Sequence, residues 1–165
     1  MNYHNITVDD MLNGDGLRTV LWVSGCMHHC RGCQNPQTWD EQSGIPFDDA
    51  AKEELFADLS RDYMDGVTFS GGDPLCPANR ETVGRLIAEI RERFPEKTVW
   101  LYTGDLVESF RDSLSFLPLI DVIVDAPYGE ALRDVNLRWK GSKNQRVIDV
   151  KQTLATGKVV LWARN

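Results

Sequence analysis

Short apolar runs alternate with helical patterns along most of this 165-residue chain. Runs rich in β-branched and aromatic residues occupy residues 18–24, 67–70, 98–102 and 121–125. Strands separated by helices predict a parallel sheet with right-handed crossovers. A closed eight-stranded barrel takes about 250 residues. We therefore predict an α/β fold whose strands form a truncated, partial parallel (β/α) barrel.

The helical segments between these runs carry apolar stripes and capping residues. Asp48 or Asp49 is predicted to cap a first helix, with its apolar positions at Ala51, Leu55, Phe56, Leu59 and Tyr63. Asn79 is predicted to cap a second helix that Pro95 ends, with its apolar positions at Val83, Leu86, Ile87, Ile90 and Phe94. A third helix is predicted over residues 105–114.

The C-terminal part of the chain departs from this alternation. Residues 146–150 and 158–163 are predicted to be further strands or a hairpin, which would form a short C-terminal extension. No linker-like or low-complexity stretch divides the sequence, and its length suits one domain. We therefore predict a single domain over residues 1–165.

Charge and hydropathy exclude several classes of partner. The net charge of −7 argues against nucleic acid and anionic membranes, which select basic surfaces. No apolar run approaches the ~20 residues of a membrane helix, and the first residues lack the pattern of a signal peptide. We expect a cytoplasmic protein without a nucleic-acid or membrane partner. Clustered cysteines in that compartment hold metals or do redox chemistry more often than they form disulfides.

The unusual residues of the chain directly follow its predicted strands. They are Cys26 to Cys33, Gly71 to Pro74, Thr103 with Gly104, and Asp125. Parallel α/β folds place their active sites at the carboxyl ends of the strands. The sequence therefore predicts one functional site at that edge of the sheet.

Three cysteines with spacings of four and three, Cys26, Cys30 and Cys33, are the strongest chemical signal. Iron–sulfur clusters are ordinarily held by cysteine thiolates, and three thiolates leave one iron of a [4Fe–4S] cluster for an outside ligand. Zinc is the alternative, with His28 or His29 as the fourth ligand. Cys76 is predicted to be a small buried apolar residue rather than a ligand.

Several motifs carry a resemblance to a known superfamily. The run GDGLRTVLWVSGC with two further cysteines, followed by a strand that ends in GGDP, resembles the radical S-adenosylmethionine superfamily. The segments CMHHCRGCQNPQTW, SGIPF and RWKGSKNQ are similar to those of glycyl-radical activating enzymes, in particular the activating proteins of anaerobic ribonucleoside-triphosphate reductases. The resemblance spans about residue 3 to about residue 148.

The resemblance implies a role for each matching position of the cysteine loop and the GGDP turn. Cys26, Cys30 and Cys33 would hold three irons, and the amino and carboxylate groups of S-adenosylmethionine would chelate the fourth. Gly71, Gly72 and Asp73 match the Gly-Gly-Glu stretch of the superfamily, which meets the amino group of the ligand. Asp73 in place of Glu is a departure from that pattern.

Further positions are assigned to ligand binding by the same resemblance. Thr103 would lie in a ligand-facing loop, and Asp125 would lie near the methionyl or ribose part of the ligand. A helix cap is the alternative role for Asp125. Gly32 replaces an aromatic residue that many members place near adenine, and His28 or His29 would supply that surface instead.

The implied reaction is the reductive cleavage of S-adenosylmethionine to methionine and a 5′-deoxyadenosyl radical, which takes hydrogen from a glycine of the partner. The implied partners are the large catalytic subunit of anaerobic ribonucleoside-triphosphate reductase and a low-potential donor of the flavodoxin or ferredoxin kind. The alternatives are activation of another glycyl-radical enzyme, a small-molecule radical enzyme such as a deazapurine synthase, and a zinc-bearing module without catalysis.

Overall fold

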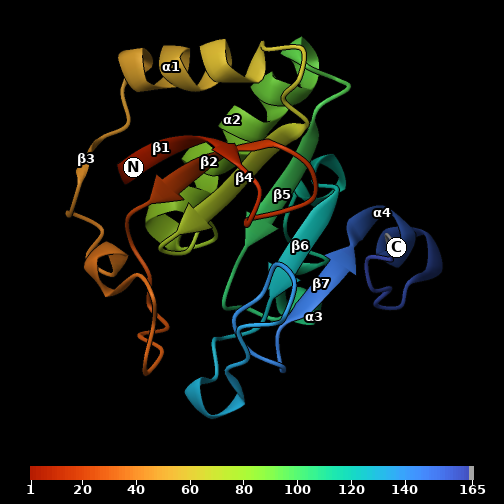
Figure 1. Cartoon of the computed structure of the whole chain (residues 1–165). Coiled ribbons are helices and arrows are strands. Elements are labelled where there is room, and N and C mark those ends of the chain that lie inside the picture. The colour runs from red at the N-terminus through yellow and green to blue at the C-terminus, as the bar shows by residue number, and fades with distance from the viewer. Residues whose placement is uncertain (164–165) are drawn as a thin grey trace.

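Seven strands form one mixed sheet in the order β3-β1-β2-β4-β5-β6-β7 (Figure 1). The computed structural model describes residues 1–163. Its central strands run parallel to one another and are β2 (Arg18–Val23), β4 (Gly66–Gly71), β5 (Thr98–Tyr102) and β6 (Val122–Asp125). The predicted α/β class and these predicted strands are confirmed.

Antiparallel strands flank the parallel centre of the sheet. β1 (Asn2–Asp10) pairs with β2, β3 (Ile45–Pro46) pairs with β1, and β7 (Arg146–Asp149) pairs with β6. Because β3 and β7 are edges, the sheet is open. The sequence did not predict β1, since its residues are mostly polar and only Tyr3 is fully buried.

Helices α1 (Asp49–Leu59) and α2 (Pro77–Arg93) follow the predicted pattern with two corrections. The Asp48 side chain caps α1 by accepting the Ala51 amide at 3.0 Å, but Tyr63 lies beyond this helix and is exposed. The predicted cap of α2 was wrong, because α2 begins after Cys76 with a proline in its first turn. Proline suits that position, since its missing N–H would have no helical partner there.

The C-terminal third also differs from the prediction. The helix expected over residues 105–114 is the single turn α3 (Val107–Phe110). β7 confirms the first of the two predicted C-terminal strands, but α4 (Val150–Thr156) follows it and ends at Gly157. Within residues 158–163 the backbone forms only an isolated bridge, from Leu161 to Ile148, so the predicted hairpin was wrong.

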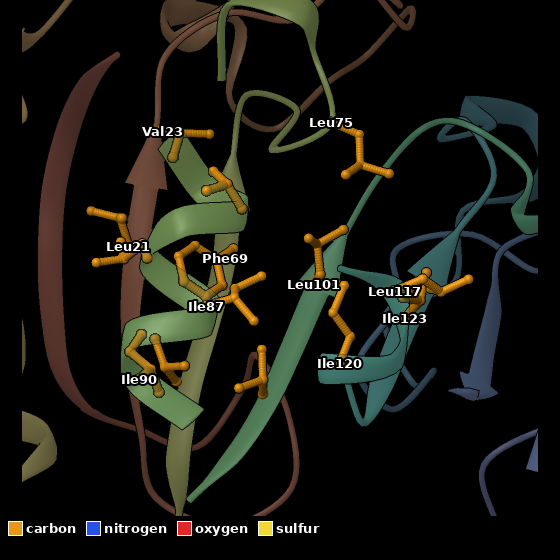
Figure 2. Close-up of a cluster of buried hydrophobic side chains, with 14 of the residues drawn as sticks. Leu21, Val23, Phe69, Leu75, Ile87, Ile90, Leu101, Leu117, Ile120 and Ile123 are labelled. Atoms are coloured by element: carbon orange, nitrogen blue, oxygen red, sulfur yellow. The ribbon is translucent and has the colours of Figure 1, made fainter. Parts of the chain in front are cut away.

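The main apolar core lies between the sheet and helices α1, α2 and α3. Figure 2 shows Ile87 and Ile90 of α2 against Leu21 and Phe69 of the sheet, with Leu101 beside them. Alternate strand residues point to the other face, where Trp100, Val122 and Val124 form a smaller cluster. Loops cover that second face around a cavity. Among the described residues, no helix has the length and apolarity needed to cross a membrane.

A fully buried arginine supports the amino end of the parallel strands, opposite the cysteine loop. The Arg18 guanidinium donates to the Thr68 hydroxyl at 2.7 Å and to the carbonyls of Val67, Thr98 and Asp15 at 2.6–2.9 Å. Burial lowers its pKa to about 10. The side chain therefore satisfies several strand and loop carbonyls with one cation.

We expect Arg18→Met to lower the free energy of unfolding by about 2–4 kcal/mol, because buried carbonyls and a hydroxyl lose their donors. Chemical denaturation of the protein measures this change. The exposed Arg85 on α2, which pairs only with Glu81, is the matched control, and Arg85→Met should change stability by less than about 0.5 kcal/mol. An Arg18→Met protein as stable as the wild type would contradict this role.

Candidate functional site at the carboxyl edge of the sheet

The loops after β2 and β4 meet at the carboxyl edge of the sheet, as predicted. Val23 pairs with Gly71 at the ends of the two strands. The Gly72 amide donates to the Val23 carbonyl and the Asp73 amide to the Gly25 carbonyl, both at 2.7 Å. Gly71 has a φ of +101°, and a Cβ at Gly72 would lie 2.5 Å from the Gly25 carbonyl oxygen. Glycine is therefore required at both positions for the loops to approach so closely.

The three motif cysteines lie on one loop and are partly exposed. Backbone bonds shape this loop: the Cys26 amide donates to Trp39 at 3.0 Å, and the Cys33 amide donates to Cys30 at 3.1 Å. The Cys33 sulfur accepts the Asn35 amide at 3.3 Å. Burial raises the pKa of Cys26 to about 11. All three thiols thus lie on one short, hydrogen-bonded loop that begins at the end of β2.

The donor set of this loop fits an iron–sulfur cluster better than a single zinc ion. Thiolate sulfurs around a tetrahedral zinc lie about 3.8 Å apart, given Zn–S bonds of about 2.3 Å. Among residues 1–163, the only ligand atoms that gather within 4.8 Å as a group of three belong to His28, Asp73 and Asp105. The three thiol sulfurs therefore do not all lie within 4.8 Å of one another, a wider spacing than that of the ligands of one zinc ion. Cys76 is buried, as predicted, at the start of α2.

The Asp73 side chain takes part in four hydrogen bonds at this edge and is only 3% exposed. Its Oδ1 accepts the Leu75 amide at 2.8 Å, and its Oδ2 accepts the Thr103 hydroxyl and the Gly104 amide at 3.0 Å each. His28 Nε2 lies 2.9 Å from the same Oδ2. The carboxylate thus joins the loops after β2, β4 and β5 at one point.

His28 and Thr103 were predicted to face the ligand, and the structure brings both of them to Asp73. The hydrogen bond that His28 donates to the Asp73 carboxylate raises the pKa of His28, which also lies 3.7 Å from Asp105. Thr103 is buried but contributes to the wall of the cavity beside the site. The two side chains are therefore placed by the same carboxylate.

Asp125 and Gly32 lie away from this cluster of side chains. Asp125 is fully buried, and its carboxylate accepts the Val107 amide at 2.9 Å and the Arg146 Nε at 2.9 Å. This geometry favours the capping role over ligand binding. Gly32 lies against Glu130, since a Cβ there would be 2.7 Å from the Glu130 Oε1. Neither residue belongs to the cavity wall.

A cavity of about 810 Å³ opens beside the cysteine loop on the face of the sheet without helices. Its wall contains Cys30, Cys33, Gly71, Gly72 and Thr103. Pockets for cofactor-sized ligands have volumes of about 300–1,000 Å³, and aromatic side chains commonly line them. The sequence did not predict the aromatic wall of this cavity, which is made by Trp22, Tyr102, Tyr128 and Trp139.

Asn79 is a further residue of the site whose role the sequence did not predict. Its buried side-chain amide donates to the Ser24 carbonyl at 2.7 Å and to the Asp73 carbonyl at 2.9 Å. These carbonyls belong to the cysteine loop and to the Gly-Gly-Asp turn. Asn79 therefore fixes the two loops against each other from the first turn of α2, a role that only the tertiary contacts reveal.

Comparison with known proteins agrees with this site. Residues 12–148 match the model of a family described as 4Fe-4S single cluster domain. The chain belongs to this family. The matched range contains the three cysteines, the Gly-Gly-Asp turn and Thr103.

Several proteins similar to this chain share one name, anaerobic ribonucleoside-triphosphate reductase-activating protein. The chain is 44% identical to the one from Enterobacteria phage T4 over 147 residues, which cover 89% of this chain and 93% of the relative. It is 40% identical to those of Vibrio cholerae and Escherichia coli K12, with 88–89% of this chain and 96–97% of the relatives covered. The predicted resemblance to these activating proteins is confirmed.

Proposed function

We propose that this chain is the activating protein of an anaerobic ribonucleoside-triphosphate reductase and generates a glycyl radical on its large subunit. The observation that carries the proposal is the position of the three-cysteine loop. This loop borders a cavity of cofactor size, in a chain that belongs to the 4Fe-4S family and is 39–44% identical to proteins named as such activators. We also propose that the open sheet is the truncated counterpart of the radical S-adenosylmethionine barrel.

In this proposal Cys26, Cys30 and Cys33 hold a [4Fe–4S] cluster, and S-adenosylmethionine binds in the adjoining cavity. The bound cluster and S-adenosylmethionine together supply reductive carbon–sulfur cleavage, with an electron from a flavodoxin- or ferredoxin-like donor. The setting would be the cytosol, where thiols stay reduced. The chain itself would bind and orient the ligand.

The Gly-Gly-Asp turn would orient the amino group of S-adenosylmethionine. Gly71 and Gly72 lie in the cavity wall without side chains, so a ligand can contact their backbone directly. Asp73 is behind this wall, with one donor on Oδ1 and three on Oδ2. Since each carboxylate oxygen offers about two lone pairs, Oδ1 retains acceptor capacity for an ammonium group.

The proposal is tested by mixing the anaerobically reduced protein, S-adenosylmethionine and the large reductase subunit. We expect a glycyl-type doublet in electron paramagnetic resonance and stoichiometric release of methionine. The doublet should be lost when the acceptor glycine of the reductase is changed to alanine. Methionine release without a radical on the partner would instead support a small-molecule radical enzyme, and zinc without iron and sulfide in the anaerobic protein would support the zinc module.

A further inference from the structure

The mouth of the cavity has an apolar rim that no other part of the described chain covers. Leu12 and Val135 are each 79% exposed and Met11 is 70% exposed, although all three border the cavity. These are the largest exposed fractions among the apolar side chains of the cavity wall. Exposed apolar side chains that gather at one site commonly mark a surface for another molecule.

Two loops carry these apolar side chains: one contains Met11 and Leu12, and the other, residues 132–143, contains Val135. Hydrogen bonds hold both loops in place. The Leu12 and Asn13 amides donate to Asp10 Oδ1 at 2.8 Å, and the Asn13 carbonyl accepts the Thr68 hydroxyl at 2.7 Å. Met11 and Leu12 therefore project from a turn whose backbone is fixed to the sheet. A loop so fixed presents its side chains outward without a large rearrangement.

The loop at residues 132–143, which carries Val135, is also fixed by hydrogen bonds. The Trp139 carbonyl accepts the Tyr102 hydroxyl at 2.7 Å, and the Gly141 amide donates to Gln145 Oε1 at 2.9 Å. Arg138 of this loop lies 3.7 Å from Asp15 of the first loop and links the two sides of the mouth. Val135 thus faces solvent from an ordered loop, and pre-organised apolar groups of this kind lower the entropic cost of association.

The second loop also has a charge opposite to that of the whole chain. Residues 132–143 contain four basic side chains, Arg133, Arg138, Lys140 and Lys143, against the single acid Asp134, a net +3 in a chain of net −7. Arg138 and Lys143 are well exposed. A partner that fits this surface has apolar side chains for the rim and acidic side chains for the loop.

We propose that Met11, Leu12 and Val135, the rim, form the docking surface for the large reductase subunit, which presents its glycine-bearing segment to the cavity. This inference rests on the proposed function, since that function requires a protein substrate to reach this cavity. Docking on the rim places the partner over an opening whose wall contains both Cys30 and the glycines of the Gly-Gly-Asp turn. The basic loop beside Val135 then selects a partner face with acidic side chains.

The test compares rim variants with the wild type in binding to the large subunit. We expect the double variant Leu12→Ser, Val135→Ser to weaken the complex about tenfold or more, since two apolar side chains would no longer be buried against the partner. Its iron content and its affinity for S-adenosylmethionine should match the wild type. Leu161→Ser, which removes an equally apolar side chain that is 59% exposed and outside the cavity wall, should leave the complex within about twofold.

Charge reversal tests the basic loop separately. The double variant Arg133→Glu, Lys143→Glu should slow association and flatten its dependence on salt, and Arg85→Glu on α2 should not. At saturating partner the rim variant should recover the wild-type yield of glycyl radical, because the change affects docking rather than the reaction.

Several outcomes would overturn the docking surface. An unchanged affinity for the large subunit would do so, as would a parallel loss of S-adenosylmethionine binding, which would make the rim a ligand contact. A self-association of the wild type that the rim variant abolishes, without any effect on the complex, would assign the rim to a second copy of this chain. A wild type that forms no glycyl radical would instead overturn the proposed function itself.

Discussion

Replacing Cys26, Cys30 or Cys33 singly with alanine is expected to abolish the intact cluster, because each change leaves one more iron without a protein ligand. Iron and sulfide in the anaerobically reconstituted protein should fall to a small fraction of the wild-type content. The absorption of the cluster should disappear with them. All three residues lie on the single loop after β2, whereas Cys76, the fourth cysteine, is buried at the start of α2.

Cys76→Ala is the matched control for these variants. Cys76 is buried at the start of α2, where its side chain makes no capping hydrogen bond. Alanine fits this position with the loss of only a small apolar group, so cluster content should remain near that of the wild type. If iron and sulfide fell as far in Cys76→Ala as in the other variants, the assignment of the ligands would be wrong.

Asp73→Ala is expected to retain the cluster but to weaken the binding of S-adenosylmethionine by roughly 10- to 150-fold. This range corresponds to the loss of one charge-assisted hydrogen bond of about 1.5–3 kcal/mol. The change also removes the acceptor of the buried Leu75 amide and of the Thr103 hydroxyl, so unfolding should become easier by about 1–3 kcal/mol. Ligand titration of the cluster-loaded protein and chemical denaturation measure the two effects.

Asp105→Ala separates a local role of Asp73 from a general effect of negative charge. Asp105 lies 3.7 Å from His28 but is partly exposed and accepts none of the loop amides that Asp73 holds. Its replacement should change the ligand affinity by less than about threefold, the range of a weakly coupled exposed charge. Equal affinities of the Asp73→Ala protein and the wild type would remove Asp73 from the ligand site.

The site depends on the register of neighbouring parallel strands. Because Val23 and Gly71 are paired, the cysteine loop and the Gly-Gly-Asp turn leave the sheet side by side. Asn79 then holds the two loops together through their carbonyls, and Asp73 adds the loop after β5. Loops that are fixed at several points in this way hold ligand groups without large rearrangement.

The sequence alone was sufficient for features set by local pattern. Continuous apolar runs predicted the four parallel strands, since strands buried on both faces need apolar residues throughout. The spacing of Cys26, Cys30 and Cys33 marked the loop that follows β2 at the candidate site, and Asp48 indicated the start of α1. Each of these features depends on a few residues that are adjacent in the sequence, so it can be predicted without the tertiary structure.

Only the tertiary structure decided features that depend on residues far apart in the chain. β1 has little apolar pattern and is a strand because β2 offers it a backbone partner. Asn79 looked like a helix cap, but its amide bridges two loops that no sequence pattern brings together. Asp125 faces Arg146 and the Val107 amide rather than the cavity, because strand alternation points it toward the helices. The neighbours of a buried polar side chain are set by the packing of the whole sheet, and its own sequence context does not contain them.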